Sequence, residues 1–255
     1  MLYNRPMRMP WHGGHFALWP RNNCPGAGSC PRGAVACAAA RMSANVAIVD
    51  YGIGNLLSVR RALEHCGASV MVSNDPRVLL DAPRLVLPGV GAFAAGMQAL
   101  VQRNLDACVV EFTLTGKPLL GICRGMQLLA TVGMEFGEHL GLGIIPGRVE
   151  AIPSTSAAGR PHKVPHIGWT GITVPKTNHG WPGTILHDVV PGANIYLVHS
   201  SAVHPSNDVH RLADFDYNGR TISAAIQKDN VCDTQFHPET SCEVGLAILR
   251  RYLAT

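Results

Sequence analysis

The sequence predicts an α/β fold in which a mostly parallel central sheet is flanked by helices. From residue 45 on, short apolar segments of strand length alternate with segments of helical periodicity. Several of these strand segments are apolar throughout, as expected for strands buried on both faces of a parallel sheet. Residues 119–130, LLGICRGMQLLA, pass from an apolar run into a helical pattern across Gly121 and Gly125, which indicates a sharp strand-to-helix elbow.

The first half of the chain supplies most of the predicted parallel strands. The expected elements, in order, are a strand at 45–50, a turn at 51–55, a helix at 56–67 closed by Gly67, a strand at 69–72, a strand within 84–93 that runs into a glycine-rich bend, a helix at about 97–111 and a strand at 117–122. Ligands of such folds collect at the carboxyl edge of the sheet, so residues that follow these strands are the first candidates for a site.

The second half is richer in strands and turns. The expected strands are 196–203, 211–227 with a turn signal at Asn218-Gly219, and 231–236. A helix over 241–254 ends the chain, and Thr240 with Glu243 fits a capping box at its start. The glycine-rich turns at 51–55 and 88–91 lack the full spacing of a phosphate-binding loop, which argues against a nucleotide site.

Composition indicates a globular chain with a separate basic leader. The sequence is 47% hydrophobic and 15% charged, and no run approaches the roughly 18 apolar residues that a membrane span needs. Residues 1–41 contain five arginines, no lysine and no acidic residue, so the remainder of the chain has 16 basic and 17 acidic residues. Because this remainder is nearly neutral, we expect it to have no general affinity for nucleic acid or membranes. We predict that residues 1–42 are a disordered extension or reflect a mis-assigned start, with translation beginning at Met42, and that 43–255 form one domain.

Cysteine usage favours a reduced, cytoplasmic protein. Three of the eight cysteines lie in the leader, and the remaining five form no Cys-x-x-Cys pair and no zinc-like spacing. Cys123 stands out because Gly121 and Gly125 flank it, as glycines flank the serine in the Gly-x-Ser-x-Gly nucleophile elbow. The alternative is an ordinary buried cysteine that packs as a small apolar residue.

A nucleophilic cysteine needs a base, and the base needs a group that orients it. His237 follows the apolar segment 231–236 and should reach the same sheet edge as Cys123, with Glu239 two residues further on to hold its imidazole. His199, after the segment 196–198, is a second candidate base. For His199 a surface or satisfied core position is the alternative.

Five motifs together resemble one known family. Residues 121–127 (GICRGMQ) and 235–239 (QFHPE) are similar to those of triad-type glutamine amidotransferases, which have a flavodoxin-like fold. Residues 50–56 (DYGIGNL), 87–93 (LPGVGAF) and 163–169 (KVPHIGW) resemble the glutaminase subunits of imidazole glycerol phosphate synthase. The resemblance extends from about Asn45 to Leu253.

The resemblance implies a role for each matching residue. Cys123 attacks the side-chain amide of glutamine, His237 transfers protons and Glu239 orients His237. The resemblance also implies a set of residues that contact the oxyanion or the substrate, some of them through backbone N–H groups. These residues are Gly89, Val90, Gly91, Arg124, Gln127, His199 and Ser200. For residues 89–91 an ordinary tight turn is the alternative.

The same resemblance implies a heterodimer with a cyclase subunit, a (β/α)8 barrel that receives the ammonia for histidine biosynthesis. Asn55, His166 and Trp169 lie in segments that face this partner in the family, although a core position is an alternative for Trp169. No cofactor, metal, nucleic acid or membrane is expected to take part.

Three departures from the family pattern leave two other functions open. Arg124 stands where an aliphatic residue is usual, Thr240 where a lysine is common, and Ser201 with Ala202 where aromatic residues are usual. A diverged paralogue could therefore supply ammonia to another synthase or hydrolyse another γ-glutamyl amide. A catalytically silent binding subunit is the alternative from a different class, which the intact triad disfavours.

Overall fold

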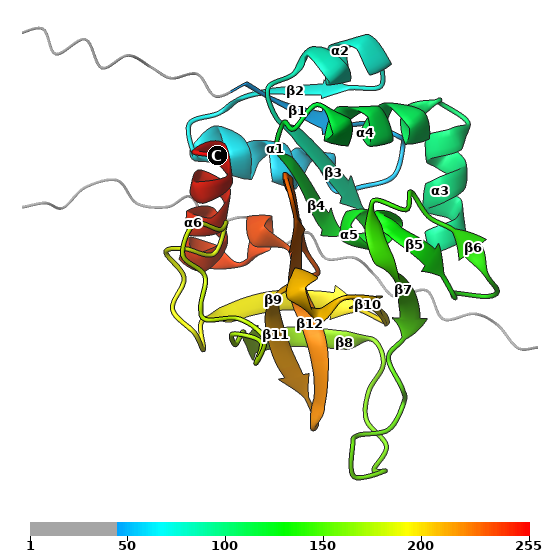
Figure 1. Ribbon diagram of the computed structural model, residues 1–255, viewed down its shortest axis with the longest axis vertical. Helices are drawn as coiled ribbons and strands as arrows, with labels where there is room; N and C mark the ends of the chain where they lie inside the picture. The colour runs from blue at the N-terminus through cyan, green and yellow to red at the C-terminus, as the bar shows by residue number, and fades with distance from the viewer. Residues whose placement is uncertain (1–44) are drawn as a thin grey trace, which may run out of the picture. The chain divides into compact units, whose positions relative to one another are not determined.

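The computed structural model describes residues 45–255 (Figure 1), and the prediction for residues 1–42 lies outside the described residues. A seven-stranded sheet in the order β11-β12-β13-β4-β3-β1-β2 forms the centre. Its strands are β1 Asn45–Val49, β2 Ser69–Ser73, β3 Leu85–Gly89, β4 Leu119–Cys123, β11 Arg211–Tyr217, β12 Arg220–Lys228 and β13 Val231–Thr234. From β13 to β2 all neighbours are parallel, while β12 pairs antiparallel with β11 and with β13, so the predicted mostly parallel sheet is confirmed.

Helices cover both faces of this sheet (Figure 1). On one face lie α1 Leu56–His65 and α6 Cys242–Leu253, and on the other lie α2 Pro76–Asp81, α3 Phe93–Val101, α4 Leu105–Leu114 and the short α5 Arg124–Leu128. Each layer buries its own apolar cluster, with Leu63 and Leu249 on the first face and Phe93 and Phe112 on the second. Burial of such side chains stabilises the fold by about 1.5–3 kcal/mol each.

Further strands extend the fold beside the carboxyl edge of the central sheet. A four-stranded sheet in the order β10-β7-β5-β6 comprises β5 Ala130–Gly133, β6 His139–Leu140, β7 Ile145–Ala151 and β10 Ser201–Pro205. A two-stranded antiparallel ribbon joins β8 His166–Gly171 to β9 Asn194–His199. Two short 3₁₀ turns, η1 Asp208–His210 and η2 Pro238–Thr240, complete the elements.

Two predicted segments are each divided in the structure. The helix expected over 97–111 is instead α3 and α4, because Asn104 between them adopts a left-handed φ of 54° that no continuous helix allows. The strand expected over 196–203 is instead β9 and β10, which belong to different sheets. The break at Ser200 turns the chain at the mouth of the pocket described below.

The predicted capping box at the start of the last helix is wrong. α6 begins at Cys242, and its N-cap Ser241 makes no side-chain cap hydrogen bond. Thr240 lies in η2, where its hydroxyl donates to the carbonyl of His237 over 3.2 Å. The Ser241 hydroxyl donates to the same carbonyl over 2.7 Å, so both side chains hold the turn that follows His237.

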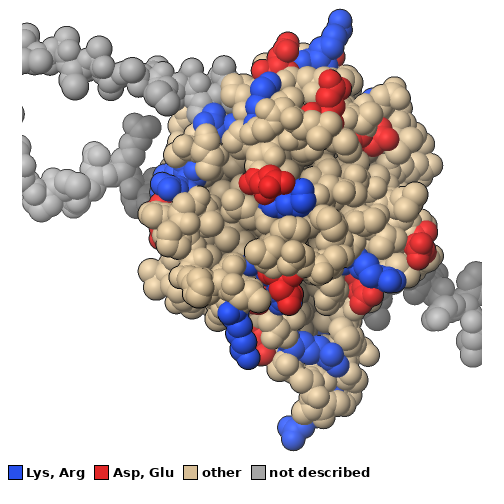
Figure 2. All heavy atoms as spheres, in the orientation of Figure 1, with Lys and Arg blue, Asp and Glu red and all other residues tan. Residues whose placement is uncertain are grey.

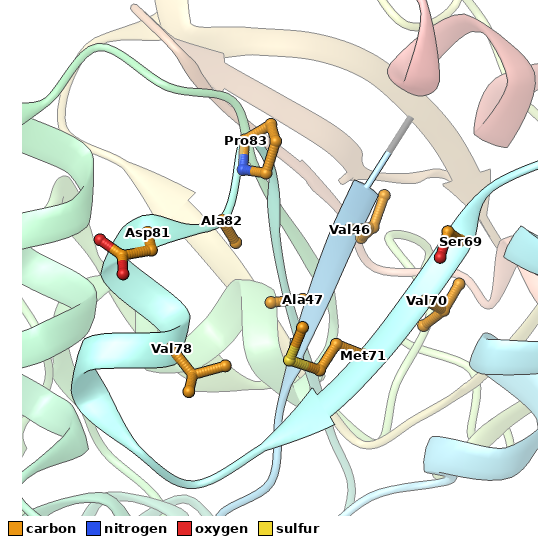
Figure 3. Close-up of a pocket in the computed structure, with 9 residues that line it drawn as sticks. All are labelled: Val46, Ala47, Ser69, Val70, Met71, Val78, Asp81, Ala82 and Pro83. Atoms are coloured by element: carbon orange, nitrogen blue, oxygen red, sulfur yellow. The ribbon is translucent and has the colours of Figure 1, made fainter. Parts of the chain in front are cut away.

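Charged side chains are mixed on the surface shown in Figure 2, where lysines and arginines alternate with acidic residues. Among the residues that the structure describes, no helix combines the length and the apolar character that crossing a membrane requires. A hollow of about 510 Å³ opens between α2 and the starts of β1 and β2, lined by Val46, Met71 and Val78 among others (Figure 3). It lies at the amino ends of the strands, away from the elbow at Cys123.

Candidate active site

Three parallel strands bring the candidate residues to one edge of the sheet. β3 ends at Gly89 and β4 ends at Cys123, and these two residues are directly opposite each other in the register. β13 runs beside β4 with Thr234 opposite Ile122, and His237 follows three residues later. The carboxyl edge therefore carries Cys123 and His237, as the sequence predicted.

The elbow at Cys123 depends on its two flanking glycines. Cys123 has φ 55° and ψ −110°, a conformation that glycine adopts far more readily than other residues, and α5 starts at the next residue. A Cβ atom added at Gly125 would overlap the carbonyl oxygen of Leu87, and one added at Gly121 would overlap the carboxyl group of Asp233. Strand and helix can approach this closely only because both positions lack side chains.

The imidazole of His237 links the thiol to a buried carboxylate. His237 Nδ1 lies 2.8 Å from Glu239 Oε1, and the Glu239 side chain is 1% exposed. Burial by itself would lower the pKa of His237, but hydrogen bonds and charge interactions with Cys123 and Glu239 raise it to about 10. The imidazole is thus placed to exchange a proton with the sulfur of Cys123, and cysteine acts as a nucleophile in its thiolate form.

Gln235, for which the sequence predicted no role although it belongs to the QFHPE motif, lies beneath the sulfur. Its Nε2 donates to Cys123 Sγ over 3.8 Å, and its Oε1 accepts from Gln127 Nε2 over 2.8 Å. Gln127 Nε2 also donates to the carbonyl of Ser201 over 3.0 Å. Both amide side chains are almost fully buried, so they form part of the rigid floor of the site.

A pocket of about 180 Å³ opens above Cys123. It is lined by Val90, Gly91, Cys123, Arg124, Gln127, Val198, His199, Ser200 and His237. Gly89 lies behind this wall, where an added Cβ would be 2.5 Å from the Tyr51 hydroxyl and 2.9 Å from the backbone nitrogen of Gly125. The structure thus brings together the predicted substrate residues, and Tyr51, which also donates to the carbonyl of Pro88 over 2.9 Å, supports the strand from below.

Arg124 connects the elbow to the start of α3. Its Nη1 donates to Gln127 Oε1 over 2.5 Å, and its Nη2 lies 3.4 Å from Glu135 Oε1. Glu135 Oε2 in turn accepts the backbone N–H of Phe93 over 2.6 Å at the first residue of α3. This carboxylate satisfies an N–H that the helix itself leaves free.

His199 is a neutral wall residue, in contrast to His237. Its Nδ1 lies 2.9 Å from the carbonyl of Ser201, which can only accept, so Nδ1 carries the proton. Burial lowers the pKa of His199 to about 4, although the hydrogen bond to Ser201 partly opposes this shift. Of the two candidate bases, only His237 has a carboxylate partner.

The residues expected to face a partner occupy different environments. Trp169 is 52% exposed and packs against Tyr196 with ring centroids 5.5 Å apart, so it is not a core aromatic. Asn55 lies at the surface at the start of α1. His166 is buried and stacks on Tyr217 with centroids 4.0 Å apart, so it lies beneath this face instead of on it.

Comparisons with known proteins agree with this geometry. The family described as glutamine amidotransferase class-I matches residues 47–253. The chain belongs to the class-I glutamine amidotransferases. Curated relatives within this family include imidazole glycerol phosphate synthase subunit HisH 1 of Legionella pneumophila (strain Lens), which is 46% identical over 209 residues, 82% of this chain and 98% of the relative. The HisH subunit of Syntrophotalea carbinolica is 44% identical over 81% of this chain and 98% of the relative.

Solved structures share the amidotransferase fold at lower identity. The chain matches a structure of PurLQS from Thermotoga maritima with a TM-score of 0.62 and 22% identity, covering 84% of this chain and 99% of that one. A structure described as a glutamine amidotransferase matches with a TM-score of 0.60 and 18% identity, covering 81% of this chain and 96% of that one. These likenesses concern the fold. Within residues 45–255, no group of three or more His, Cys, Asp or Glu side chains is arranged to hold a metal ion.

Proposed function

We propose that this protein is the glutaminase subunit of imidazole glycerol phosphate synthase and that residues 43–255 form its amidotransferase domain. The observation that carries the proposal is the alignment of Cys123, at a strained elbow, with the His237–Glu239 pair at the same sheet edge. The 42–46% identity with HisH subunits over most of the chain supports the choice of this synthase among class-I amidotransferases.

In the proposed reaction Cys123 Sγ attacks the side-chain amide carbon of glutamine as a thiolate. His237 then donates its proton to the leaving nitrogen, which departs as ammonia and leaves a γ-glutamyl thioester on the sulfur. Water attacks the thioester while His237 accepts a proton from it, and glutamate and the thiolate are released. Glu239 keeps the imidazole oriented and stabilises its protonated form, as a carboxylate does in other triads.

The negative oxygen that develops in each step needs donors close to Cys123. The backbone N–H of Arg124 lies at the start of α5, directly after the nucleophile. Gly89 is opposite Cys123 in the strand register, and Val90 and Gly91 line the same pocket. We assign these N–H groups to the oxyanion, a role in which each donor contributes about 2.7–4 kcal/mol. His199 and Ser200 also line this pocket and are assigned to substrate contacts.

Ammonia would pass to a cyclase subunit with a (β/α)8 barrel, and the assembly would work in the cytoplasm for histidine biosynthesis. The exposed Trp169, with Asn55 at the start of helix α1, is assigned to the face that meets this partner. Exposed aromatic side chains are frequent in the centre of protein interfaces. The proposed steps need no cofactor, because the Cys123 sulfur forms the covalent bond, His237 transfers the protons and water hydrolyses the thioester.

The proposal is tested by measuring glutamate release from glutamine by the full chain, alone and with the cyclase and its ribonucleotide substrate. Low basal turnover that rises severalfold with the liganded cyclase is the expected result. Cys123→Ala and His237→Ala should each lose activity by about a thousandfold or more. The half-buried Cys66→Ala is the matched control, since it removes a thiol outside the site.

A second function, an independent γ-glutamyl amidase, is favoured by the charged Arg124 in the pocket wall. High basal turnover that does not respond to the cyclase would support it and would contradict the synthase assignment. Full activity of Cys123→Ala would reject both, because both use the same nucleophile.

A further inference from the structure

The pocket above Cys123 has one side chain with a permanent charge. Among its lining residues, Arg124 is the only lysine, arginine, aspartate or glutamate. Its side chain is 12% exposed, so the guanidinium lies in the wall of the pocket and not out in solvent. A desolvated guanidinium binds carboxylates strongly, often through two parallel hydrogen bonds.

Gln127 cannot fill the same role, because its amide is already occupied. An amide side chain has two N–H groups, and both belong to Nε2 in Gln127. One donates to the carbonyl of Ser201 and the other to Gln235 Oε1. The Gln127 side-chain oxygen accepts from Arg124. Gln127 therefore has no N–H left to offer to an anionic group of a ligand, and its structural role is to hold Arg124 and Gln235 in place.

Arg124 keeps donors for a ligand and is held in a fixed orientation. A guanidinium has five N–H groups. Arg124 Nη1 donates to Gln127 Oε1, and Nη1 and Nη2 also lie 3.3 and 3.4 Å from the two carboxylate oxygens of Glu135. These three contacts engage at most three of the five N–H groups and leave two for a ligand. Glu135 is itself fixed by the backbone N–H of Phe93. The remaining N–H groups belong to a side chain whose position is set before any ligand arrives, which reduces the entropy lost on binding.

We propose that Arg124 is a specificity-determining residue that binds the α-carboxylate of the substrate while Cys123 attacks the side-chain amide. This inference rests on the proposed glutaminase function. The two groups of glutamine are separated by three carbon atoms, and the two protein groups belong to adjacent residues at the elbow. Arg124 thereby selects γ-glutamyl amides that carry a free α-carboxylate over simple amides.

The test compares Arg124→Leu with the unchanged protein, each in complex with its liganded cyclase, by ammonia release from three amides. Glutamine carries both α-groups, glutaramate lacks only the α-amino group, and 4-aminobutanamide lacks only the α-carboxylate. Loss of Arg124 should lower kcat/KM about 10- to 150-fold for glutamine and glutaramate, the effect expected for a hydrogen bond to a charged group. The already slow hydrolysis of 4-aminobutanamide should not change.

The third substrate separates recognition from a structural effect. If Arg124 only supports the elbow or the thiolate, Arg124→Leu will lower kcat/KM for all three amides by the same factor, and the inference fails. Arg124→Lys should recover part of the glutamine activity, because it keeps the charge but not the planar fork. Arg77→Leu, which removes an exposed arginine on α2, is the control and should alter none of the ratios. No turnover of glutamine by the unchanged complex would reject the proposed function itself.

Discussion

Asp233 offers a quantitative test of the packing beneath the elbow. Its side chain is fully buried, its Oδ1 accepts the backbone N–H of Gly121 over 3.1 Å, and its Oδ2 has no hydrogen-bond partner among the described residues. Burial raises its pKa well above the usual value, although the hydrogen bond from Gly121 opposes this shift. The carboxyl group is therefore expected to be a neutral acid in the folded protein.

Linkage gives the sign and size of the effect of Asp233→Asn. An unfolded aspartate ionises near pH 4, whereas the folded one keeps its proton to higher pH, so the folded state loses about 1.4 kcal/mol per pH unit in between. Asparagine never ionises and can accept the same N–H of Gly121. The stability gained by Asp233→Asn should thus grow by about 2.7 kcal/mol from pH 5 to pH 7 if the folded acid stays protonated.

Urea unfolding of both proteins, followed by tryptophan fluorescence at each pH from 5 to 8, measures this difference. Asp81→Asn is the control and should give only a small difference, since Asp81 is exposed and makes no ion pair among the described residues. A difference for Asp233→Asn that does not change with pH, or that has the opposite sign at pH 7, would refute the assignment of a buried neutral acid.

Two other perturbations test the imidazole and the elbow. Glu239→Gln should move the high-pH fall of glutaminase activity to lower pH, because Glu239 helps His237 to keep its proton up to about pH 10. The measurement is the pH profile of kcat/KM, and an upper limb at the same pH in both proteins would contradict this expectation. Gly125→Ala should destabilise the fold by about 3 kcal/mol or more in thermal unfolding, because its Cβ meets the backbone of Leu87, whereas Gly143→Ala, with open space but φ 68°, should lose only about 1 kcal/mol.

Much of the parallel sheet could be predicted because β1, β3 and β4 are short and almost entirely apolar. The turn at Asn218-Gly219 was also predictable, since both residues need the positive φ values that they adopt, 54° and 81°. Helix α2 was missed although Asp75 and Pro76 are a strong start signal, with the Asp75 carboxylate accepting the N–H of Arg77. The helix has only six residues, so it has almost no periodicity to detect.

The candidate site was predictable where chemistry follows from local sequence, as at Cys123 and His237. Glu135 and Gln235 were missed because their roles arise from contacts across the fold: Glu135 caps a helix that starts 42 positions earlier, and Gln235 reaches a sulfur 112 positions away. The burial of His166 likewise depends on Tyr217, which comes from a separate hairpin. The spacing of residues along the sequence does not indicate which distant residues will form such contacts.

The backbone of Cys123 has a consequence for the stability of the fold. At φ 55° and ψ −110° a side chain costs about 1–3 kcal/mol, which glycine would not incur. Cys123→Gly is therefore expected to raise the melting temperature while abolishing glutamine hydrolysis, and an unchanged or lower melting temperature would show that the sulfur's contacts outweigh the strain. A gain in melting temperature for Cys123→Gly would identify the strain at this residue as a stability cost of placing a nucleophile at the elbow.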